Sequence, residues 1–304
     1  MMNVSIAYIL VVLIWSTTPL TVKWSSVGLD PMSGVFYRIF IAAAVGWVLL
    51  KLLKIEIRWD RAALQGYMAA VLGIFGTMSL VYWAATMIPS GLISVLFGFS
   101  PILTGLMAQK YLNEPKFTLS QWFSFLISIA GLVMLFGQNA SLGARVTYGL
   151  ALVLTAVIFF SVSGILVKRY ADESIDPLAH TVGSLICSTP LFAIAWLVFG
   201  EMHLPSETKA IGSILYLSLG GSLLGFVCYY YVLKKLSATT VTLITLVNPV
   251  LALLLGQWLA GEYIGVLGWF ATGLIGVGVG VYLLGGVNVN VAKDADNNPK
   301  VAAS

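Results

Sequence analysis

The sequence has little charge and few of the residues that enzymes and metal sites use. Asp, Glu, Lys and Arg make up only 9% of the 304 residues, whereas a soluble domain carries about 25%. Both cysteines, Cys187 and Cys228, lie in apolar runs, which excludes a disulfide framework and a cysteine metal site. No phosphate-binding loop, carboxylate pair or nucleophile–base cluster is visible. We therefore expect no enzyme, no metal and no cofactor.

Hydrophobic residues are abundant instead, at 59% of the chain. A membrane-crossing helix needs about 20 mostly apolar residues, and ten segments meet this description. They are residues 4–22, 34–53, 64–84, 91–111, 119–137, 147–167, 178–199, 211–233, 239–260 and 264–284. The first has no basic leader or cleavage site, so we interpret it as a retained span. The lipid bilayer is the expected surrounding, and the net charge of +4 indicates topology rather than nucleic-acid binding.

The basic residues predict the orientation of the chain. If the N-terminus is cytoplasmic, twelve Lys and Arg residues fall on the cytoplasmic side and only three, Lys23, Arg145 and Lys209, fall on the other. Cytoplasmic connections are enriched in Lys and Arg, so this placement is favoured. It also places the C-terminus in the cytoplasm, which requires an even number of spans and agrees with ten.

A duplication runs through the chain. The series Tyr82, Ser100, Pro101 and Glu114 recurs 148 residues later as Tyr230, Asn248, Pro249 and Glu262. Each copy holds five spans, an odd number, so the second copy is inverted, as is typical of secondary transporters. We predict an all-α polytopic membrane protein whose ten transmembrane helices form two inverted five-helix repeats. The repeats are residues 1–138 and 139–287, and residues 288–304 are expected to form a disordered cytoplasmic tail.

Prolines and small polar residues near the membrane centre predict a substrate cavity. Pro19, Pro101 and Pro249 break helical hydrogen bonds, and the freed groups must be buried in protein or line a wet cavity. The expected cavity residues are Trp15, Ser16, Tyr82, Ser100, Ser161, Tyr230 and Asn248, with Arg38 near the outer mouth. The alternatives are packing kinks, hydroxyls bonded to their own helices and an interfacial aromatic belt.

Arg38 is the one strong base inside a predicted span. A central arginine costs about 2.5–3.5 kcal/mol on insertion scales, so we interpret it either as a structural anchor or as a contact for a substrate carboxylate or a gate. No Asp or Glu lies in the centre of a span, which favours uniport or exchange over proton antiport. His180 is an alternative proton carrier or an ordinary interfacial histidine.

Two glutamates and two lysines occupy equivalent places in the copies. Glu114 and Glu262 precede the last span of each repeat, where a carboxylate caps free amide groups. In the inverted arrangement Glu114 and Lys168 share one side of the membrane, and Glu262 and Lys23 share the other. The sequence therefore predicts either helix caps or two ties between the repeats, Lys168–Glu114 and Lys23–Glu262, that gate opposite ends.

The plan resembles the EamA-like branch of the drug/metabolite transporter superfamily. The residues that carry the resemblance run from Trp15 to Lys23, at Tyr37-Arg38, from Ser100 to Glu114, at Trp122 and Gly131, from Asn248 to Glu262, and at Trp269 and Gly278. The resemblance implies two EamA domains and a central cavity walled by helices 1–4 and 6–9, with helices 5 and 10 set apart. Members export amino acids, related metabolites or toxic compounds, and others import. Ser184 stands where the second repeat would carry Arg38.

These observations predict an inner-membrane secondary transporter, with both termini cytoplasmic, that exports small organic metabolites by alternating access. Amino acids and aromatic or amphipathic solutes suit an aromatic, hydroxyl-lined cavity. An uptake permease is the alternative, and a scaffold or a channel is disfavoured because no charged ring or carbonyl filter is evident. The expected partners are a small-molecule substrate and lipid, with no nucleic acid. The expected state is a monomer or a weak homodimer.

Overall fold

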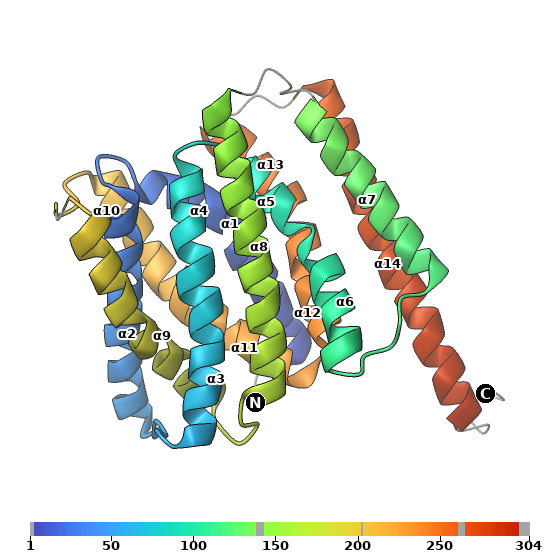
Figure 1. Ribbon diagram of the computed structural model, residues 1–304, viewed down its shortest axis with the longest axis horizontal. Helices are drawn as coiled ribbons and strands as arrows, with labels where there is room; N and C mark the ends of the chain where they lie inside the picture. Colours follow the sequence, from blue (N-terminus) through green and yellow to red (C-terminus); the bar gives the residue numbers. More distant parts are fainter. Residues whose placement is uncertain (1–2, 138–142, 202, 261–264, 298–304) are drawn as a thin grey trace. The chain divides into compact units, whose positions relative to one another are not determined.

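The computed structural model describes residues 3–137, 143–201, 203–260 and 265–297, and its regular secondary structure over these ranges is entirely helical (Figure 1). Eight of the described helical segments are long and apolar enough to cross a membrane, and two shorter apolar segments, Leu119–Gly131 and Val266–Tyr282, complete the predicted ten. The fold is that of a multi-pass, all-α membrane protein with the expected five segments in each half.

The first half contains five segments, two of which are composite. They are α1 (Val4–Ser25); α2 (Pro31–Leu53); α3 (Arg61–Val71), η1 (Leu72–Thr77) and α4 (Met78–Ala85); α5 (Ser90–Phe97) and α6 (Ser100–Tyr111); and α7 (Leu119–Gly137).

The second half repeats this order. Its segments are α8 (Ala144–Tyr170); α9 (Pro177–Phe199); α10 (Thr208–Tyr216), η2 (Leu217–Leu224) and α11 (Gly225–Lys235); α12 (Ala238–Thr242) and α13 (Ile244–Ala260); and α14 (Val266–Asn297). Helix α14 continues to Asn297, so residues 288–297 of the expected disordered tail are helical in this structure.

The second helix of each half begins in the same way. Asp30 accepts a hydrogen bond from the Ser33 backbone N–H at 2.9 Å, and Asp176 accepts one from the Leu178 backbone N–H at 2.8 Å. A proline follows each aspartate at the first helical position, where its missing N–H costs nothing. These two caps place the duplicated Asp-Pro motif at the start of α2 and of α9.

The third span of each half contains a π-helix that the sequence analysis does not predict. The segments η1 and η2 interrupt α3–α4 and α10–α11 at equivalent points. Both are rich in glycine, with Gly73 and Gly76 in η1 and Gly220 and Gly221 in η2. Wide turns of this kind often occur at functional sites; η1 contributes Gly73 and Thr77 to the cavity described below, and η2 contacts two of its lining residues, Trp15 and Arg38.

The helix breaks follow the prolines only in part. The fourth span breaks at Gly98–Phe99, and Pro101 stands in the first turn of α6. The ninth span breaks at Leu243, whereas Pro249 lies inside α13. Pro19 likewise lies inside α1, which is continuous from Val4 to Ser25. Proline therefore marks the break in the fourth span directly, whereas the break in the ninth span lies six residues before Pro249.

The helices divide into two compact units, each containing parts of both halves. The cavity unit, residues 1–114 and 142–262, holds helices 1–4 and 6–9; in it α2 packs along α9 and α1 packs along α13. The second unit is the pair α7 and α14, where Gly131 lets α7 approach Ala271 and Gly278 lets α14 approach Ser128 (Figure 1). Small residues permit such close approach of membrane helices.

Candidate functional site

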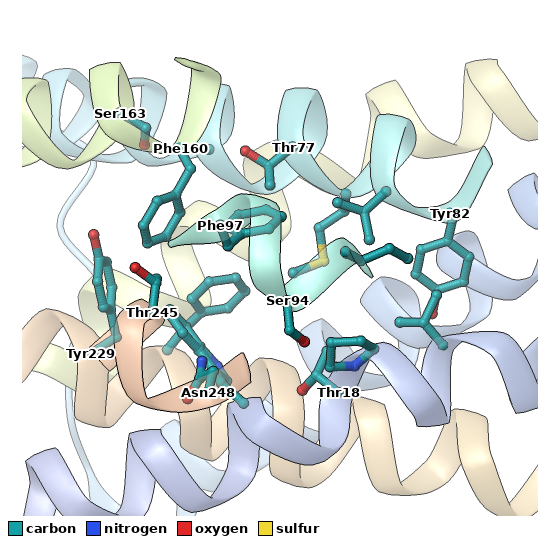
Figure 2. Close-up of a pocket in the computed structure, with 18 of the residues that line it drawn as sticks. Thr18, Thr77, Tyr82, Ser94, Phe97, Phe160, Ser163, Tyr229, Thr245 and Asn248 are labelled. Carbon is teal, nitrogen blue, oxygen red and sulfur yellow. The ribbon is translucent and has the colours of Figure 1, made fainter. Parts of the chain in front are cut away.

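The main candidate site is a cavity inside the cavity unit, with an empty volume of about 880 Å³ including the solvent at its mouth. Eight elements contribute side chains to it, and Figure 2 shows Tyr82 and Tyr229 on opposite sides with Ser94 and Phe97 between them. Its lining residues are Trp15, Thr18, Pro19, Val22, Arg38, Gly73, Thr77, Met78, Val81, Tyr82, Ile93, Ser94, Phe97, Phe160, Ser163, Phe226, Tyr229, Tyr230, Thr245 and Asn248.

An aromatic wall forms one part of the cavity. Trp15 contacts Tyr229 at 5.0 Å, Phe226 at 5.8 Å and Phe160 at 6.0 Å between ring centroids. Tyr230 continues the wall beside Tyr229, at 5.2 Å. Ring pairs in this range are mutually stabilising, by about 0.5–1.5 kcal/mol each beyond area burial. The wall offers a flat or branched apolar group a firm surface.

A glycine of the second half, Gly225, allows Trp15 to reach its place. Its indole Nε1 donates to the Gly221 carbonyl at 3.4 Å, and a Cβ atom at Gly225 would stand only 2.7 Å from that nitrogen. Any side chain at Gly225 would therefore displace the indole. The absence of a side chain at Gly225 and the Gly221 carbonyl thus set the position of the largest aromatic group in the cavity.

Arg38 is buried on α2, with 1% of its surface exposed, and it lines the same cavity. Its Nε donates to the Ser222 hydroxyl at 2.7 Å, and its Nη2 has no hydrogen-bond partner. Within the described residues no acidic side chain lines the cavity. Asp30, the acid at the start of α2, is occupied with Ser33 and with the Glu201 backbone N–H. The cavity therefore carries one positive charge and no fixed counter-charge.

Two further polar groups of the lining are buried without partners. The Tyr82 hydroxyl and the Ser94 hydroxyl make no hydrogen bond, although their residues are 0% and 3% exposed. Buried polar groups are nearly always satisfied, so an orphan group in a cavity indicates a ligand or water partner. By contrast, Thr77 donates to the Ala156 carbonyl at 3.2 Å and Ser163 to the Ala69 carbonyl at 2.7 Å.

Asn248 lines the cavity from α13 and also ties the repeats. With its amide nitrogen turned toward them, Asn248 donates to the Val12 carbonyl at 3.3 Å and to the Ile244 carbonyl at 3.1 Å. The first of these bonds reaches α1 of the other half. Asn248 therefore holds α13 against α1. Its equivalent in the first repeat, Ser100, is buried and its hydroxyl makes no hydrogen bond.

The structure brings together five of the eight predicted cavity residues: Trp15, Arg38, Tyr82, Tyr230 and Asn248. Ser16, Ser100 and Ser161 are buried but outside the lining, and Ser16 donates to the Leu13 carbonyl of its own helix at 2.8 Å. Pro19 lines the cavity, whereas Pro101 and Pro249 do not.

Sequence reasoning missed several lining residues, including Thr18, Thr77, Ser94, Phe97 and Tyr229. Thr18 lies within the stretch from Trp15 to Lys23 that carries the family resemblance, and the Gly73–Gly76 pair beside Thr77 was a usable signal. Ser94 and Phe97 have no such signal, because alternate faces of an apolar span look alike until neighbouring helices are placed. The information missing from the sequence was therefore which face of each helix points into the cavity.

A second pocket lies at the end of the cavity unit where α8 and α11 end and α9 begins, which we call the basic end. Lys168, Lys234 and His180 line it, with an empty volume of about 430 Å³. Tyr230 lines both this pocket and the central cavity, and its ring packs on the His180 ring at 4.7 Å. The Tyr230 side chain therefore forms part of the partition between the two spaces.

Glu114 and Lys168 hold the α11–α12 connection from two sides instead of pairing with each other. Glu114 accepts hydrogen bonds from the Ala238 backbone N–H at 2.7 Å and the Thr239 hydroxyl at 2.6 Å. The Lys168 Nζ donates to the Leu233 carbonyl at 2.8 Å and the Lys234 carbonyl at 3.3 Å.

This arrangement corrects the expected direct pair of Lys168 and Glu114, which is absent from the salt bridges of the described residues. Free amides at the start of α12 attract the carboxylate, and free carbonyls at the end of α11 attract the ammonium. The predicted Lys23–Glu262 tie lies outside the described residues, because Glu262 does.

An ionic contact also joins the halves at the basic end. Arg58 bonds Asp60 at 2.7 Å and Asp172 at 2.9 Å. The hydrogen bond from Arg58 lowers the pKa of Asp60 below its usual value, and bonds from Ser174, followed by the charge of Arg58, lower the pKa of Asp172. At the opposite end, Trp196 donates to the Ser33 hydroxyl at 2.8 Å, and the Glu201 backbone N–H donates to the Asp30 carboxylate at 3.2 Å.

The described residues contain no group of three His, Cys, Asp or Glu side chains placed to hold a metal ion. What the cavity can offer is one guanidinium, a few hydroxyls and an aromatic wall. These groups bind and orient a small amphipathic molecule, and they include no nucleophile paired with a base.

Comparison with known proteins gives consistent results. The sequence pattern of the EamA-like transporter family matches residues 2–137 and 147–284. An uncharacterized transporter of Archaeoglobus fulgidus is 27% identical over 278 residues, covering 89% of this chain and 95% of that protein.

Shorter matches and a solved structure add to this. The uncharacterized inner membrane transporter YedA of Escherichia coli is 28% identical over 65% of this chain and 63% of its own length. A probable terminal-alkyne amino-acid exporter of Streptantibioticus cattleyicolor is 26% identical over 62% of each chain. One crystal structure superposes with a TM-score of 0.73 at 18% identity, covering 92% of this chain and 97% of its own.

Proposed function

The chain belongs to the EamA-like transporter family, and from this premise we propose that it exports small organic metabolites through the central cavity by alternating access. The observation that carries the proposal is the cavity itself. It is walled by both repeats, and it combines an aromatic surface with a few polar groups. Pockets of about 300–1,000 Å³ with this composition are typical of small-molecule sites.

In the proposed cycle, the two ends of the cavity unit open and close alternately. At the basic end, Glu114 holds α12, Lys168 holds α11 and Tyr230 separates the cavity from the second pocket. Opening there requires these contacts to break. In an inverted repeat the equivalent elements at the other end are then expected to close, with Lys23 and Glu262 as the proposed counterparts.

Amino acids and other amphipathic or aromatic solutes are the proposed substrates. The aromatic wall around Trp15 accepts their apolar part, and hydroxyls such as those of Tyr82 and Ser94 are available to their polar part. The similarity to a probable amino-acid exporter supports this class. We further propose an inner-membrane location with cytoplasmic termini, supported by the basic residues at one end and by the similarity to an inner membrane transporter.

Counterflow in proteoliposomes tests the proposal, with labelled phenylalanine as the probe and unlabelled phenylalanine, leucine and phenylpropionate inside the vesicles in turn. Saturable, trans-stimulated uptake is expected. Trp15→Ala should weaken it by about tenfold, the size of one good aromatic contact. Trp258→Ala is the matched control, because Trp258 is 79% exposed on α13. Linear, unsaturated flux would indicate a channel, and no flux with any internal solute would contradict transport of this class.

An uptake permease of the same fold is the second candidate, because the orientation of the helices does not determine the direction of net flux. Export and uptake are separated in cells that lack or overproduce the protein. An exporter lowers the internal pool of the tested solute, whereas an uptake permease raises it. The proposed assembly is a monomer or weak homodimer, since the central cavity lies within one chain.

A further inference from the structure

Arg38 has far more hydrogen-bonding capacity than the protein uses. A guanidinium carries five N–H donors in a rigid fork. Only the Nε–H has a recorded partner among the described residues, the Ser222 hydroxyl, and Nη2 has none. A structural arginine would be expected to satisfy its fork with carbonyls or a carboxylate. The free edge of this fork indicates that its main partner comes from outside the chain.

Among the described residues, no carboxylate forms an ion pair with Arg38. The described residues that line the cavity include no Asp or Glu, and Asp30 on the same helix is held by its own cap contacts. A buried cation without a counter-ion is unfavourable unless a charged partner arrives. The cavity therefore has an electrostatic preference for an anion over a cation or a neutral molecule.

The charged group adjoins the aromatic wall. A Cβ atom at Gly221 would lie 3.1 Å from Arg38 Nη2, and the carbonyl of the same glycine accepts the hydrogen bond from Trp15. One glycine thus separates the guanidinium from the indole. A ligand with a carboxylate beside a ring or a branched apolar group would meet both at once.

We propose that Arg38 is the anion-binding group of the cavity, and that the substrates are apolar monocarboxylates for which an ammonium group is not required. The inference rests on the proposed transport function and narrows its substrate class. The carboxylate is expected to replace the missing partners of the guanidinium in a two-point contact, while the apolar part packs on Trp15, Phe226 and Tyr229. Ser222 is a positioning residue that holds the fork through Nε.

A matched pair at Ser222 tests the charge directly. Ser222→Asp places a carboxylate where the hydroxyl now meets Arg38 and supplies the counter-charge from within, whereas Ser222→Asn has the same shape and no charge. We expect Ser222→Asp to bind 3-phenylpropionate at least about tenfold more weakly than Ser222→Asn, in line with charged hydrogen bonds. Thermal unfolding in detergent should show that both variants are folded, because Asp can pair with Arg38.

Three probes that share a phenyl ring test the class of ligand in the unaltered protein. These are 3-phenylpropionate, phenylalanine and phenethylamine, which carry a carboxylate, both groups and an ammonium respectively. The two carboxylates should raise the unfolding temperature and compete in counterflow, and phenethylamine should do neither. Phenethylamine binding as tightly as 3-phenylpropionate, no binding of either carboxylate, or equal affinity in the two Ser222 variants would overturn the inference.

The two proposals fail in different ways. Saturable counterflow that depends neither on the carboxylate of the solute nor on the Ser222→Asp substitution would contradict the anion site and still support transport. Absence of counterflow for every internal solute removes the transport proposal, whatever the detergent binding measurements show.

Discussion

The two π-helical segments occupy equivalent places in the repeats and contact chemically different side chains. η1 packs on α8, where Ser163 lies against Gly73 and Thr77 bonds the Ala156 carbonyl. η2 packs on α1 and α2, where Trp15 and the unsatisfied fork of Arg38 lie against it. The first contact is neutral and satisfied, and the second holds a charge with unused donors.

The difference extends to the helix that faces η2. At the position of Arg38 on α2, the second repeat has Ser184 on α9. The Ser184 hydroxyl donates to the His180 carbonyl of its own helix at 2.7 Å, and the residue is fully buried. The duplicated backbone therefore supports two kinds of surface. The first half provides the charge and the second half provides most of the aromatic wall, so inverted symmetry of the fold does not require symmetry of binding.

The largest expected effect comes from removing the Arg38 side chain, with its equivalent Ser184 as the control. Arg38→Gln should lower counterflow of labelled 3-phenylpropionate by about 10- to 100-fold, because hydrogen bonds to charged groups contribute about 1.5–3 kcal/mol. Ser184→Ala should change it little, since that hydroxyl serves its own helix. Equal losses in the two variants, measured at equal reconstitution, would break the comparison.

Glycine substitutions in the two π-helices should have opposite consequences. A Cβ at Gly73 would stand 2.5 Å from Ser163 Oγ and 2.8 Å from its Cβ, so Gly73→Ala is expected to destabilise by about 1–3 kcal/mol through overpacking. Ser163→Gly should restore the unfolding temperature when combined with it, because it removes both obstructing atoms.

Gly221→Ala meets the end of a flexible side chain instead, at 3.1 Å from Arg38 Nη2. It should shift the unfolding temperature less than Gly73→Ala and should weaken counterflow of 3-phenylpropionate more. If both alanine variants lowered stability alike and left transport intact, η2 would have no special role.

The equivalent tyrosines Tyr82 and Tyr230 should differ in what they separate. Tyr230→Ala removes part of the partition between the cavity and the second pocket. A thiol reagent added at the basic end should then modify Ser94→Cys faster, in a chain whose Cys187 and Cys228 are replaced. Tyr82→Ala is the matched control and should not speed labelling from that end. Similar labelling rates in the two variants would contradict the partition.

The smallest expected effect concerns the Arg58 contact. The pKa of Asp60 and that of Asp172 are lowered in the folded protein. Their contribution to stability is therefore present above the ordinary carboxyl pKa and is lost as the pH falls through the lowered values. Arg58→Gln should shift this acid loss of the unfolding temperature toward higher pH and leave the value at neutral pH nearly unchanged, because exposed pairs contribute little. If the unfolding temperature at acidic pH were the same in Arg58→Gln, the Arg58 contact would not contribute to acid stability.

The sequence was a good guide to the scaffold because lipid imposes strong patterns. Spans need long apolar runs, and the recurrence of Tyr82 and Pro101 as Tyr230 and Pro249 revealed the duplication. It was a weaker guide to the site. Which face of a span carries Ser94 or Ser100 depends on the helices packed around it, and that information is not local.

Electrostatic partners were also hard to predict. Sidedness correctly placed Lys168 and Glu114 at one end, but each found backbone groups of the α11–α12 connection instead of the other. Helix termini compete effectively for charges because their amides and carbonyls are unsatisfied. The wide turns of η1 and η2 were marked only by their glycines, which also serve simple packing.

The pairing of α7 with α14 has a consequence for biosynthesis. α7 ends at Gly137 and α14 begins at Val266, so more than a hundred residues are translated between the two partners. Translation proceeds at about 5–20 residues per second. The small-residue face of α7 around Ser128 and Gly131 therefore stays uncovered in the membrane for several seconds or longer before Ala271 and Gly278 are synthesised. During that interval the nascent chain offers an open surface for close helix packing, and the last helix to be inserted completes the assembly of the fifth.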